Sequence, residues 1–211
     1  MIKEELQKYA EEHSSPESEV LFQLNRETHL KTVHPRMLSG HLQGKFLEMV
    51  TCMIRPIQIL EIGTFTGYSA ICLSKGLTLD GCIHTIEKNP ELEHIAMNAF
   101  KKAGIENQIN YYSGDAMDLI PEIDEKFDLV FIDADKENYL NYYHLVFDKL
   151  NPGAFILADN ALWSGKVIEE ASPADKDTLG LLAFNDFVQQ DTRVENLLLP
   201  FRDGIMMVRK L

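Results

Sequence analysis

Two short polar clusters, each placed directly after an apolar run, carry the residue types of a metal site. Asp133 follows one run, and the pair Asp159-Asn160 follows the next run along the chain. If the two runs are neighbouring strands, their ends lie about 4.8 Å apart and the three side chains can direct oxygens at one position. Two carboxylates that converge repel each other unless a cation compensates them. An all-oxygen set favours a hard ion such as Mg²⁺, Ca²⁺ or Mn²⁺ over Zn²⁺. The alternative is three hydrated polar side chains at ordinary strand ends.

Two more residues near these clusters could act on a substrate. Lys136 lies three residues after Asp133 and can reach the same position. A nearby divalent charge favours the neutral amine, which makes Lys136 a candidate proton acceptor. The alternative is an ion pair with Asp135 or another acid. Trp163 is the only tryptophan and follows the second cluster in a predicted loop, where it either walls a flat substrate or packs in the core.

The segment 61–69, EIGTFTGYS, runs from an apolar stretch into a glycine-containing turn and a helix start. Because glycine has no Cβ atom, Gly63 and Gly67 permit close approach of a ligand, and a nucleotide-like ligand is the candidate. The segment lacks both GxGxxG and GxxxxGK[ST], which argues against a dinucleotide or a triphosphate. Glu61 would repel phosphates and attract an ammonium group. The alternative is a turn that needs glycine for its backbone alone.

Two further strand ends carry acids. Glu87 closes the apolar run after the glycine turn, where an acid can accept both hydroxyls of a ribose. NAD enzymes share this signal, and an acid here would also favour the N-terminus of the helix that follows. The third run ends at Gly114-Asp115-Ala116, where the main chain and the small Ala116 could border an adenine, or Asp115 is an ordinary loop acid.

These residues need a scaffold that brings strand ends to one edge. Apolar runs alternate with helical stretches, which predicts an α/β fold with a buried parallel sheet. The tail is predicted to be an antiparallel hairpin, because its two apolar runs lie too close together for a crossover. The predicted strands are 58–63, 82–87, 109–114, 127–134, 154–160, 195–201 and 205–211.

Helical periodicity and capping signals fill the rest of the chain. The first 55 or so residues are expected to be helical, with a second helix capped by Ser15. In the N-terminal part, one helix is expected over 2–13, a second starts at Ser15-Pro16-Glu17, and a third follows Met37–Gly40 and ends at Pro56. Two further helices are expected over Asn89–Gly104 and Asn138–Leu150, the latter ended by Asn151-Pro152-Gly153. A long loop is expected over Ala161–Asp175.

Composition bounds the class of protein. With 211 residues, 45% hydrophobic and 25% charged, the chain is expected to be one globular domain. The net charge of −13 disfavours nucleic-acid and anionic-membrane partners. Cys52, Cys72 and Cys82 show no CxxC spacing, so we expect buried thiols and a cytoplasmic location. No stretch approaches the ~18 apolar residues of a membrane span, and no targeting segment is expected.

The motifs EIGTFTGYS, IEKN, SGDA, FIDADK and ADNALWSGKV, in this order, resemble those of the cation-dependent class I O-methyltransferases, the caffeoyl-CoA and catechol O-methyltransferase-like family. The resemblance runs from about Leu30 to Leu211. It implies a single methyltransferase domain, with residues 1–55 as a helical N-terminal lid and 56–211 as a Rossmann-like core. It also implies a seven-stranded, mostly parallel sheet with an antiparallel last strand and helices on both faces, S-adenosylmethionine as methyl donor, and homodimers.

The resemblance also implies roles for single residues. Asp133, Asp159 and Asn160 match the metal ligands, and Lys136, with Asp133, is expected to be catalytic, Lys136 as the general base. The residues that match cofactor contacts are Ser39, Glu61, Gly63, Thr64, Ser69, Glu87, Ala116 and Asp135. The lid segment reads MLSGHLQGKFL, where many bacterial members carry a proline and an acid between the serine and the QG pair.

We therefore expect divalent-metal-dependent methylation of a hydroxyl of a small ortho-dihydroxy aromatic, with Trp163 as a substrate contact. The identity of the acceptor is not encoded in these motifs. One alternative within the fold is methylation of a tRNA hydroxyuridine, which the net charge disfavours. Two alternatives come from other classes of protein. An NAD-dependent dehydrogenase would share Glu87 but should carry GxGxxG, which this chain lacks. A non-catalytic binding module would bind donor and metal but methylate no acceptor.

Overall fold

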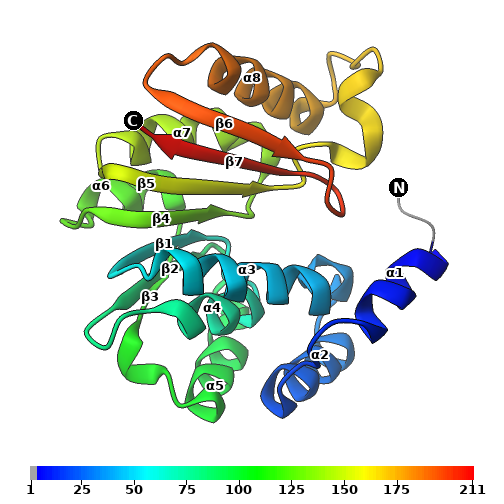
Figure 1. The fold of residues 1–211 in the computed structure, drawn as a ribbon, viewed down its shortest axis with the longest axis vertical. Helices are drawn as coiled ribbons and strands as arrows, with labels where there is room; N and C mark the ends of the chain where they lie inside the picture. The colour runs from blue at the N-terminus through cyan, green and yellow to red at the C-terminus, as the bar shows by residue number, and fades with distance from the viewer. Residues whose placement is uncertain (1–3) are drawn as a thin grey trace. The chain divides into compact units, whose positions relative to one another are not determined.

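The computed structural model describes residues 4–211 and shows an α/β protein (Figure 1). Its longer helices and its strands are, in chain order, α1 (Glu4–Glu12), α2 (Glu19–Lys31), α3 (His41–Ile54), β1 (Gln58–Ile62), α4 (Tyr68–Leu73), β2 (Cys82–Glu87), α5 (Glu93–Ala103), β3 (Ile109–Ser113), α6 (Ala116–Glu122), β4 (Phe127–Ile132), α7 (Tyr139–Phe147), β5 (Leu150–Asp159), α8 (Lys176–Gln190), β6 (Val194–Leu199) and β7 (Ile205–Lys210). Within this described part, no helix is both long and apolar enough to span a bilayer.

The seven strands have the order β3-β2-β1-β4-β5-β7-β6, and β7 runs antiparallel to both of its neighbours. This confirms the predicted class: a mostly parallel, Rossmann-like sheet with an antiparallel last strand and a helical N-terminal region. The strand order reverses between β1 and β4, which is where open α/β sheets bind ligands at the carboxyl ends of their strands.

The chain divides into two compact units. The first comprises Gln58–Gly63 and Asp115–Leu211, and the second comprises 4–57 and Thr64–Gly114. The expectation of one domain with a lid over 1–55 and a core over 56–211 stays a prediction.

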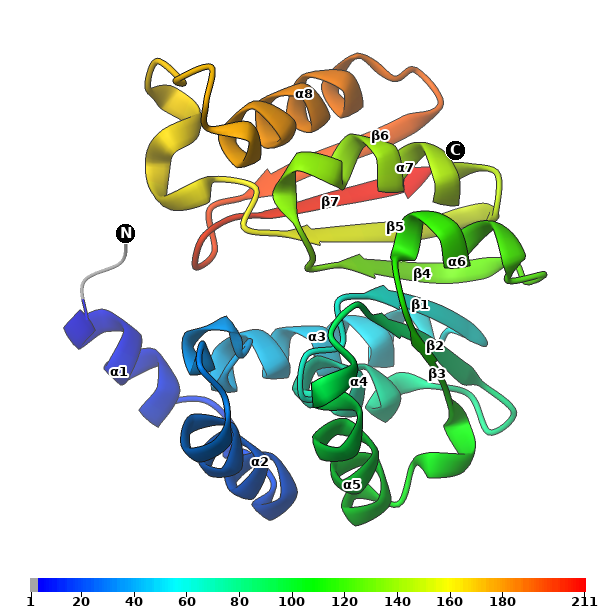
Figure 2. The same ribbon diagram turned by 180° about the vertical axis from the view of Figure 1, so that it is seen from behind.

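The first unit is built on β1, β4, β5, β7 and β6. The side chains of β4 and β5 are almost wholly buried, as expected for continuous apolar runs. Helices α6, α7 and α8 lie on one face of these strands (Figures 1 and 2). Under them, Tyr143 and Phe184 are fully buried and their ring centroids lie 6.1 Å apart. This packed layer fixes the positions of the strand ends that follow.

The second unit contains α1 to α5 and the parallel pair β2 and β3. Its helices α3 and α4 pack closely at Gly44, where an added Cβ atom would lie 2.7 Å from the Tyr68 ring. The α5 helix ends at Gly104, which has a φ of +68°. That glycine confirms the predicted C-terminus of this helix.

The second helix begins later than predicted. Ser18, not Ser15, caps it, with the Ser18 hydroxyl accepting a hydrogen bond from the Leu21 amide at 3.4 Å. The residues before Ser18 make tertiary contacts instead. The carbonyl of Ser15 is 2.7 Å from a ring nitrogen of His41, and the Glu17 carboxylate accepts a hydrogen bond from the Tyr68 hydroxyl.

Two other boundaries differ from prediction. Helix α7 ends at Phe147, and β5 begins at Leu150 and runs through Pro152. The ladder between β4 and β5 shifts register after Phe127, and this irregularity accommodates the proline. The expected loop over Ala161–Asp175 contains a short 3₁₀ segment, Trp163–Ile168.

Helix α1 confirms the helix expected over 2–13, although Ile2 lies outside the described residues and Leu6 is 58% exposed. The cysteines depart from expectation. All three cysteines are thiols. Cys72 is buried as predicted, but Cys52 is exposed on α3 and Cys82 is half-buried, so the expectation of three buried thiols is wrong.

Candidate active site

In the first unit, the two predicted metal-binding acids lie at the ends of adjacent strands. Strand β4 pairs in parallel with β5, and the last pair in register is Ile132 with Ala158. Asp133 and Asp159 each follow that pair by one residue, so they occupy equivalent positions at the same edge. Side chains at equivalent positions of neighbouring strands point to the same face of a sheet. The two acids therefore end neighbouring strands, as the hypothesis of a shared site requires, and the metal site itself stays a prediction.

Lys136 lies against this strand edge and is 7% exposed. Its Nζ donates to Oδ1 of Asp133 at 3.1 Å and to Oη of Tyr139 at 2.7 Å. The ion pair with an acid is the alternative weighed for this lysine, although the acid is Asp133 and not Asp135. The same contact places the Lys136 amine beside a predicted metal ligand. The position of Lys136 is therefore compatible both with an ion pair and with a proton acceptor at the predicted site.

Tyr139 is the centre of this arrangement, and its role was missed from the sequence. It is fully buried, and its hydroxyl lies 3.2 Å from the Ile132 carbonyl and 3.1 Å from the Asp159 carbonyl. In the sequence it belongs to an apolar helical stripe, which is typical of a core residue. Its place three residues after Lys136, at the start of α7, was the available signal.

Negative charge is concentrated at this edge. The pKa of Tyr139 is raised well above its ordinary value, first by burial and then by the charges of Asp133 and Asp159. Both carboxylates therefore act on the same phenol. Lys136 is the cation that contacts one of them.

The turn after β5 holds Asn160 and Trp163. Asn160 has a φ of +58°, in the left-handed region that asparagine tolerates better than most residues. Its backbone N–H donates to Oδ1 of Asp159 at 2.8 Å. The Trp163 amide donates to the Asn160 carbonyl at 3.0 Å. The Lys136 amine lies 6.0 Å from the centroid of the Trp163 ring. The indole N–H is buried and has no hydrogen-bond partner among the described residues.

Asp135 and Ala116, also in the first unit, were predicted to contact a cofactor. The Asp135 carboxylate accepts hydrogen bonds from the Tyr142 hydroxyl, at 2.5 Å, and from the Asn138 side chain. Ala116 begins α6 and is buried. Asp115 caps that helix by accepting from the Met117 amide at 2.9 Å, so it is a capping residue and not an ordinary loop acid.

Gly63 directly follows β1 and begins the turn, with a φ of +100°. An added Cβ atom would lie 2.0 Å from the Asp133 carbonyl oxygen. The position that a Cβ atom on Gly63 would take is therefore filled by backbone, so this glycine is needed for close packing. The glycine allows the predicted metal-binding strand end to approach β1. The expected cofactor contact of Gly63 stays a prediction. Glu61, in β1, is fully buried.

In the second unit, the rest of the glycine turn is held against the end of β2. The Phe65 amide donates to Oε2 of Glu87 at 2.7 Å, and the Asn89 amide donates to Oε1 at 2.8 Å. The hydroxyls of Thr64 and Thr85 lie 2.5 Å apart. The pKa of Glu87 is raised, mainly by burial, while hydrogen bonds from backbone amides oppose the shift. The predicted turn residue and the predicted ribose acid thus lie in one local network.

The far side of the same turn is also occupied by protein. An added Cβ atom on Gly67 would lie 2.6 Å from the Phe100 ring, so the turn needs this glycine for packing. The hydroxyl of Thr66 lies 2.9 Å from that of Thr28 in α2, and both residues are fully buried. Sequence reasoning missed this link, because two threonines far apart in the chain carry no pairing signal.

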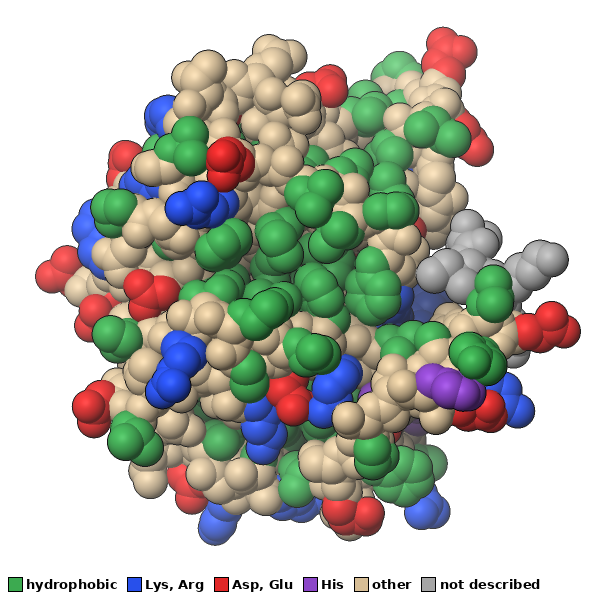
Figure 3. Space-filling view, in the orientation of Figure 1, with side chains coloured by type: hydrophobic (Ala, Val, Ile, Leu, Met, Phe, Trp, Pro, Cys, Tyr) green, Lys and Arg blue, Asp and Glu red, His purple; other side chains and the backbone are tan. Residues whose placement is uncertain are grey.

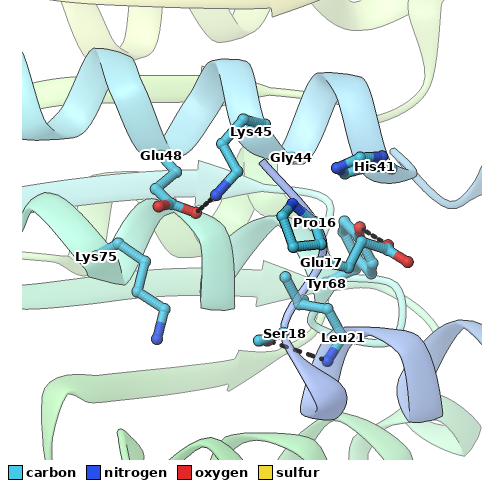
Figure 4. A pocket seen from close by; sticks show the side chains of 10 residues that line it. All are labelled: Pro16, Glu17, Ser18, Leu21, His41, Gly44, Lys45, Glu48, Tyr68 and Lys75. Atoms are coloured by element: carbon cyan, nitrogen blue, oxygen red, sulfur yellow. Dashed lines mark hydrogen bonds and ion pairs between the residues drawn. The ribbon is translucent and has the colours of Figure 1, made fainter. Parts of the chain in front are cut away.

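The remaining predicted residues of the second unit are Ser39 and Ser69, both 6% exposed. The unit also has a pocket of about 180 Å³ beside α3 and α4, shown in Figure 4, which none of the predicted residues lines. In it Lys45 forms an ion pair with Glu48 at 2.8 Å.

Among the described residues, no group of three or more His, Cys, Asp or Glu side chains is gathered for metal binding. The predicted set holds only two such residues, because its third ligand is the amide of Asn160.

Comparisons with known proteins agree on one family. A family model described as O-methyltransferase matches residues 11–211. A caffeoyl-CoA O-methyltransferase of Medicago sativa is 34% identical over 183 residues, covering 80% of this chain and 73% of that protein. A flavonoid 3',5'-methyltransferase of Vitis vinifera is 36% identical over 180 residues, covering 80% of this chain and 77% of that protein.

Solved structures give the same result. The O-methyltransferase TomG of Streptomyces achromogenes, in complex with SAM, superimposes with a TM-score of 0.92 at 27% identity, covering 100% of this chain and 99% of that one. An O-methyltransferase of Bacillus cereus, in complex with SAH, has a TM-score of 0.91 at 28% identity, covering 98% of this chain and 97% of that one.

Proposed function

Because the chain belongs to the O-methyltransferase family, we propose that it transfers the methyl group of S-adenosylmethionine to a hydroxyl of a small ortho-dihydroxy aromatic, with the help of a divalent cation. The similarity to caffeoyl-CoA and flavonoid methyltransferases supports a phenolic acceptor. The observation that carries the finer proposal is the placement of Asp133 and Asp159 at equivalent ends of β4 and β5, with Lys136 in contact with the first of them.

Asp133, Asp159 and Asn160 are the residues that would hold the cation. Two carboxylates and an amide form an all-oxygen donor set, which fits Mg²⁺, Ca²⁺ or Mn²⁺. The equivalent positions of Asp133 and Asp159 at the ends of adjacent strands support this fit. A cation bound there supplies a fixed positive charge that favours the ionised form of an acceptor hydroxyl.

Lys136 is the proposed proton acceptor. Contacts at 3.1 Å to Asp133 and 2.7 Å to Tyr139 hold its Nζ at the strand edge. In its neutral form, Lys136 takes the proton that the acceptor hydroxyl releases as its oxygen bonds to the donor methyl carbon. The carbon–sulfur bond breaks, and its electron pair stays on the donor sulfur. The protein contributes by holding oxygen and carbon in line and by excluding water.

Trp163 is the proposed acceptor contact. Its ring lies 6.0 Å from the Lys136 amine, and its buried indole N–H has no partner among the described residues. An unsatisfied buried donor is costly unless a ligand pairs with it. A flat, oxygen-bearing aromatic could meet both the ring and the N–H.

The predicted contacts with the methyl donor are proposed for each unit by itself. In the second unit Ser39, Thr64, Ser69 and Glu87 are the candidates, and the Glu87 carboxylate is already ordered by two amide hydrogen bonds. In the first unit the candidates are Glu61, Gly63, Ala116 and Asp135.

The test is methyl transfer from labelled S-adenosylmethionine to a panel of catechols, with and without EDTA. We expect turnover that EDTA abolishes and Mg²⁺ restores. Asp159→Asn should lower turnover, whereas Asp186→Asn, which removes an exposed acid from α8 of the same unit, should not. Unchanged turnover in EDTA would contradict metal dependence. Labelled methyl on bulk tRNA, with none on any catechol, would contradict the acceptor class.

We also propose a homodimer that uses the strand face opposite α6, α7 and α8. Register places Leu197, Met207 and Leu157 side by side on that face, and Leu197 is 54% exposed. Figure 3 shows hydrophobic side chains gathered over this part of the first unit. Leu197→Glu should convert a dimer to a monomer in light scattering, whereas Leu79→Glu, at a 99% exposed loop residue, should not. A monomeric unmodified protein at micromolar concentration would contradict the proposal.

A cytoplasmic location is proposed as well, supported by the three cysteine thiols.

A further inference from the structure

We propose that Tyr139 is the positioning residue of the site: its hydroxyl, held at the carbonyls of Ile132 and Asp159, fixes the amine of Lys136. The inference rests on the proposed function, because it assumes that Lys136 is the proton acceptor. It adds a residue to which neither motif nor family comparison assigned a role.

The contacts of the Tyr139 hydroxyl use its full hydrogen-bonding capacity. The oxygen accepts from Lys136 Nζ at 2.7 Å. The single phenolic hydrogen faces two carbonyl oxygens, that of Ile132 at 3.2 Å and that of Asp159 at 3.1 Å. A phenol has one donor and can accept as well, so it can link an amine to strand carbonyls in this way.

The effect on Lys136 follows from the flexibility of its side chain. A lysine has four rotatable side-chain bonds, and burying it in one conformation costs entropy that contacts must offset. Two polar contacts hold the amine, one to Asp133 and one to Tyr139. In the proposed mechanism Asp133 also serves the cation. Of the two residues that hold the Lys136 amine, Tyr139 is therefore the one with no second role in the proposed mechanism.

The position of Tyr139 on α7 makes it distinct from its neighbours. Helix α7 carries two other buried tyrosines. The hydroxyl of Tyr142 donates to Asp135, and that of Tyr143 donates to Asp191 at 2.8 Å. Neither contacts the lysine. Tyr143 therefore offers a matched control, because Tyr143→Phe removes one buried hydroxyl from the same helix without touching the site.

The experiment compares Tyr139→Phe with Tyr143→Phe in steady-state kinetics with Mg²⁺, labelled S-adenosylmethionine and a catechol. We expect kcat of Tyr139→Phe to fall about 10–100-fold, the range for residues that orient a catalytic or metal-binding group. The KM for the donor should change less than about twofold, because Tyr139 does not contact the donor in this proposal. Tyr143→Phe should keep the kcat of the unmodified protein.

A double-mutant cycle separates positioning from a general structural effect. If Tyr139 acts through Lys136, adding Tyr139→Phe to Lys136→Ala should cause little further loss of kcat. The full loss repeated in the Lys136→Ala background, or a normal kcat in Tyr139→Phe, would overturn the inference. If Tyr139→Phe does not fold, Tyr139→Met is scored by the same criteria. A normal kcat in Lys136→Ala would instead overturn the proposed general base, so the two failures are distinguishable.

Discussion

Replacing Gly63 with alanine would test whether this glycine is required by the protein backbone itself. The Cβ atom of alanine would lie 2.0 Å from the carbonyl oxygen of Asp133 and 2.8 Å from its carbonyl carbon. A flexible side chain could move away, but these are main-chain atoms. They are also tied to β1, because the Asp133 amide donates to the Ile62 carbonyl at 2.9 Å. The overlap therefore has to displace the end of β4.

The magnitude can be separated into two parts. A non-glycine residue at positive φ costs about 1–2 kcal/mol, and forcing an atom into a filled position costs about 1–3 kcal/mol more. Gly63→Ala should therefore lower the free energy of unfolding by about 2–5 kcal/mol. Gly104→Ala is the matched control, because Gly104 has a φ of +68° with no atom within 4 Å of an added Cβ. It should cost only the first part.

The assay is urea denaturation of the protein without ligands, in which the fluorescence of Trp163 monitors unfolding. The difference between the two variants isolates the overlap and should be about 1–3 kcal/mol. Because the displaced atoms belong to Asp133, Gly63→Ala should also weaken Mg²⁺ binding, and Gly104→Ala should not. Equal stability of the two variants would refute the reasoning, since the close approach at Gly63 would then carry no cost.

Two further perturbations address the glycine turn of the second unit. Thr28→Val should lower the free energy of unfolding by about 1–3 kcal/mol, because it leaves the buried Thr66 hydroxyl unpaired. Urea denaturation compares this loss with that of Thr32→Val, one helical turn further on, which removes a half-buried hydroxyl that donates to the Thr28 carbonyl at 2.9 Å. An equal loss in both variants would contradict it. Burial raises the pKa of Glu87, and in its proposed role the carboxylate is the form that would accept two ribose hydroxyls. Donor affinity should therefore be constant at high pH and fall as pH drops through that raised pKa. The same shift makes the ionised form unfavourable for folding, so the Glu87 contribution to stability without donor should improve as pH falls through that range. Calorimetric titration of the donor across pH measures the affinity, and a profile that Glu87→Gln leaves unchanged would contradict the role of this carboxylate.

The strand ends could be predicted because their signals are local. Continuous apolar runs followed by Asp133 and Asp159 reveal the strands, and parallel topology places their ends at one edge. The antiparallel hairpin of β6 and β7 could also be predicted, because the connection between the two strands is too short for a crossover. Helix starts were less certain: Ser15 and Ser18 are both good caps, and tertiary contacts of the intervening residues decide between them.

The contacts that complete the site could not be predicted, because they depend on distant residues. Tyr139 is typical of a core position in the sequence, and only the fold shows that its hydroxyl meets Lys136 and two strand carbonyls. The spacing of Gly63 and Gly67 indicated a ligand turn, but the atoms beside both glycines are protein. The sequence indicates that glycine is needed at these positions, but it does not indicate whether a ligand or the protein itself occupies the space beside them.

The central claim is that Asp133, Asp159 and Asn160 hold one divalent cation. The most direct measurement is an anomalous difference map from crystals grown with MnCl₂. The account predicts a single strong peak among these three side chains, and loss of that peak in Asp159→Asn. An intact methyl-transfer activity in the same preparation, together with no peak there or with a peak elsewhere, would contradict the account.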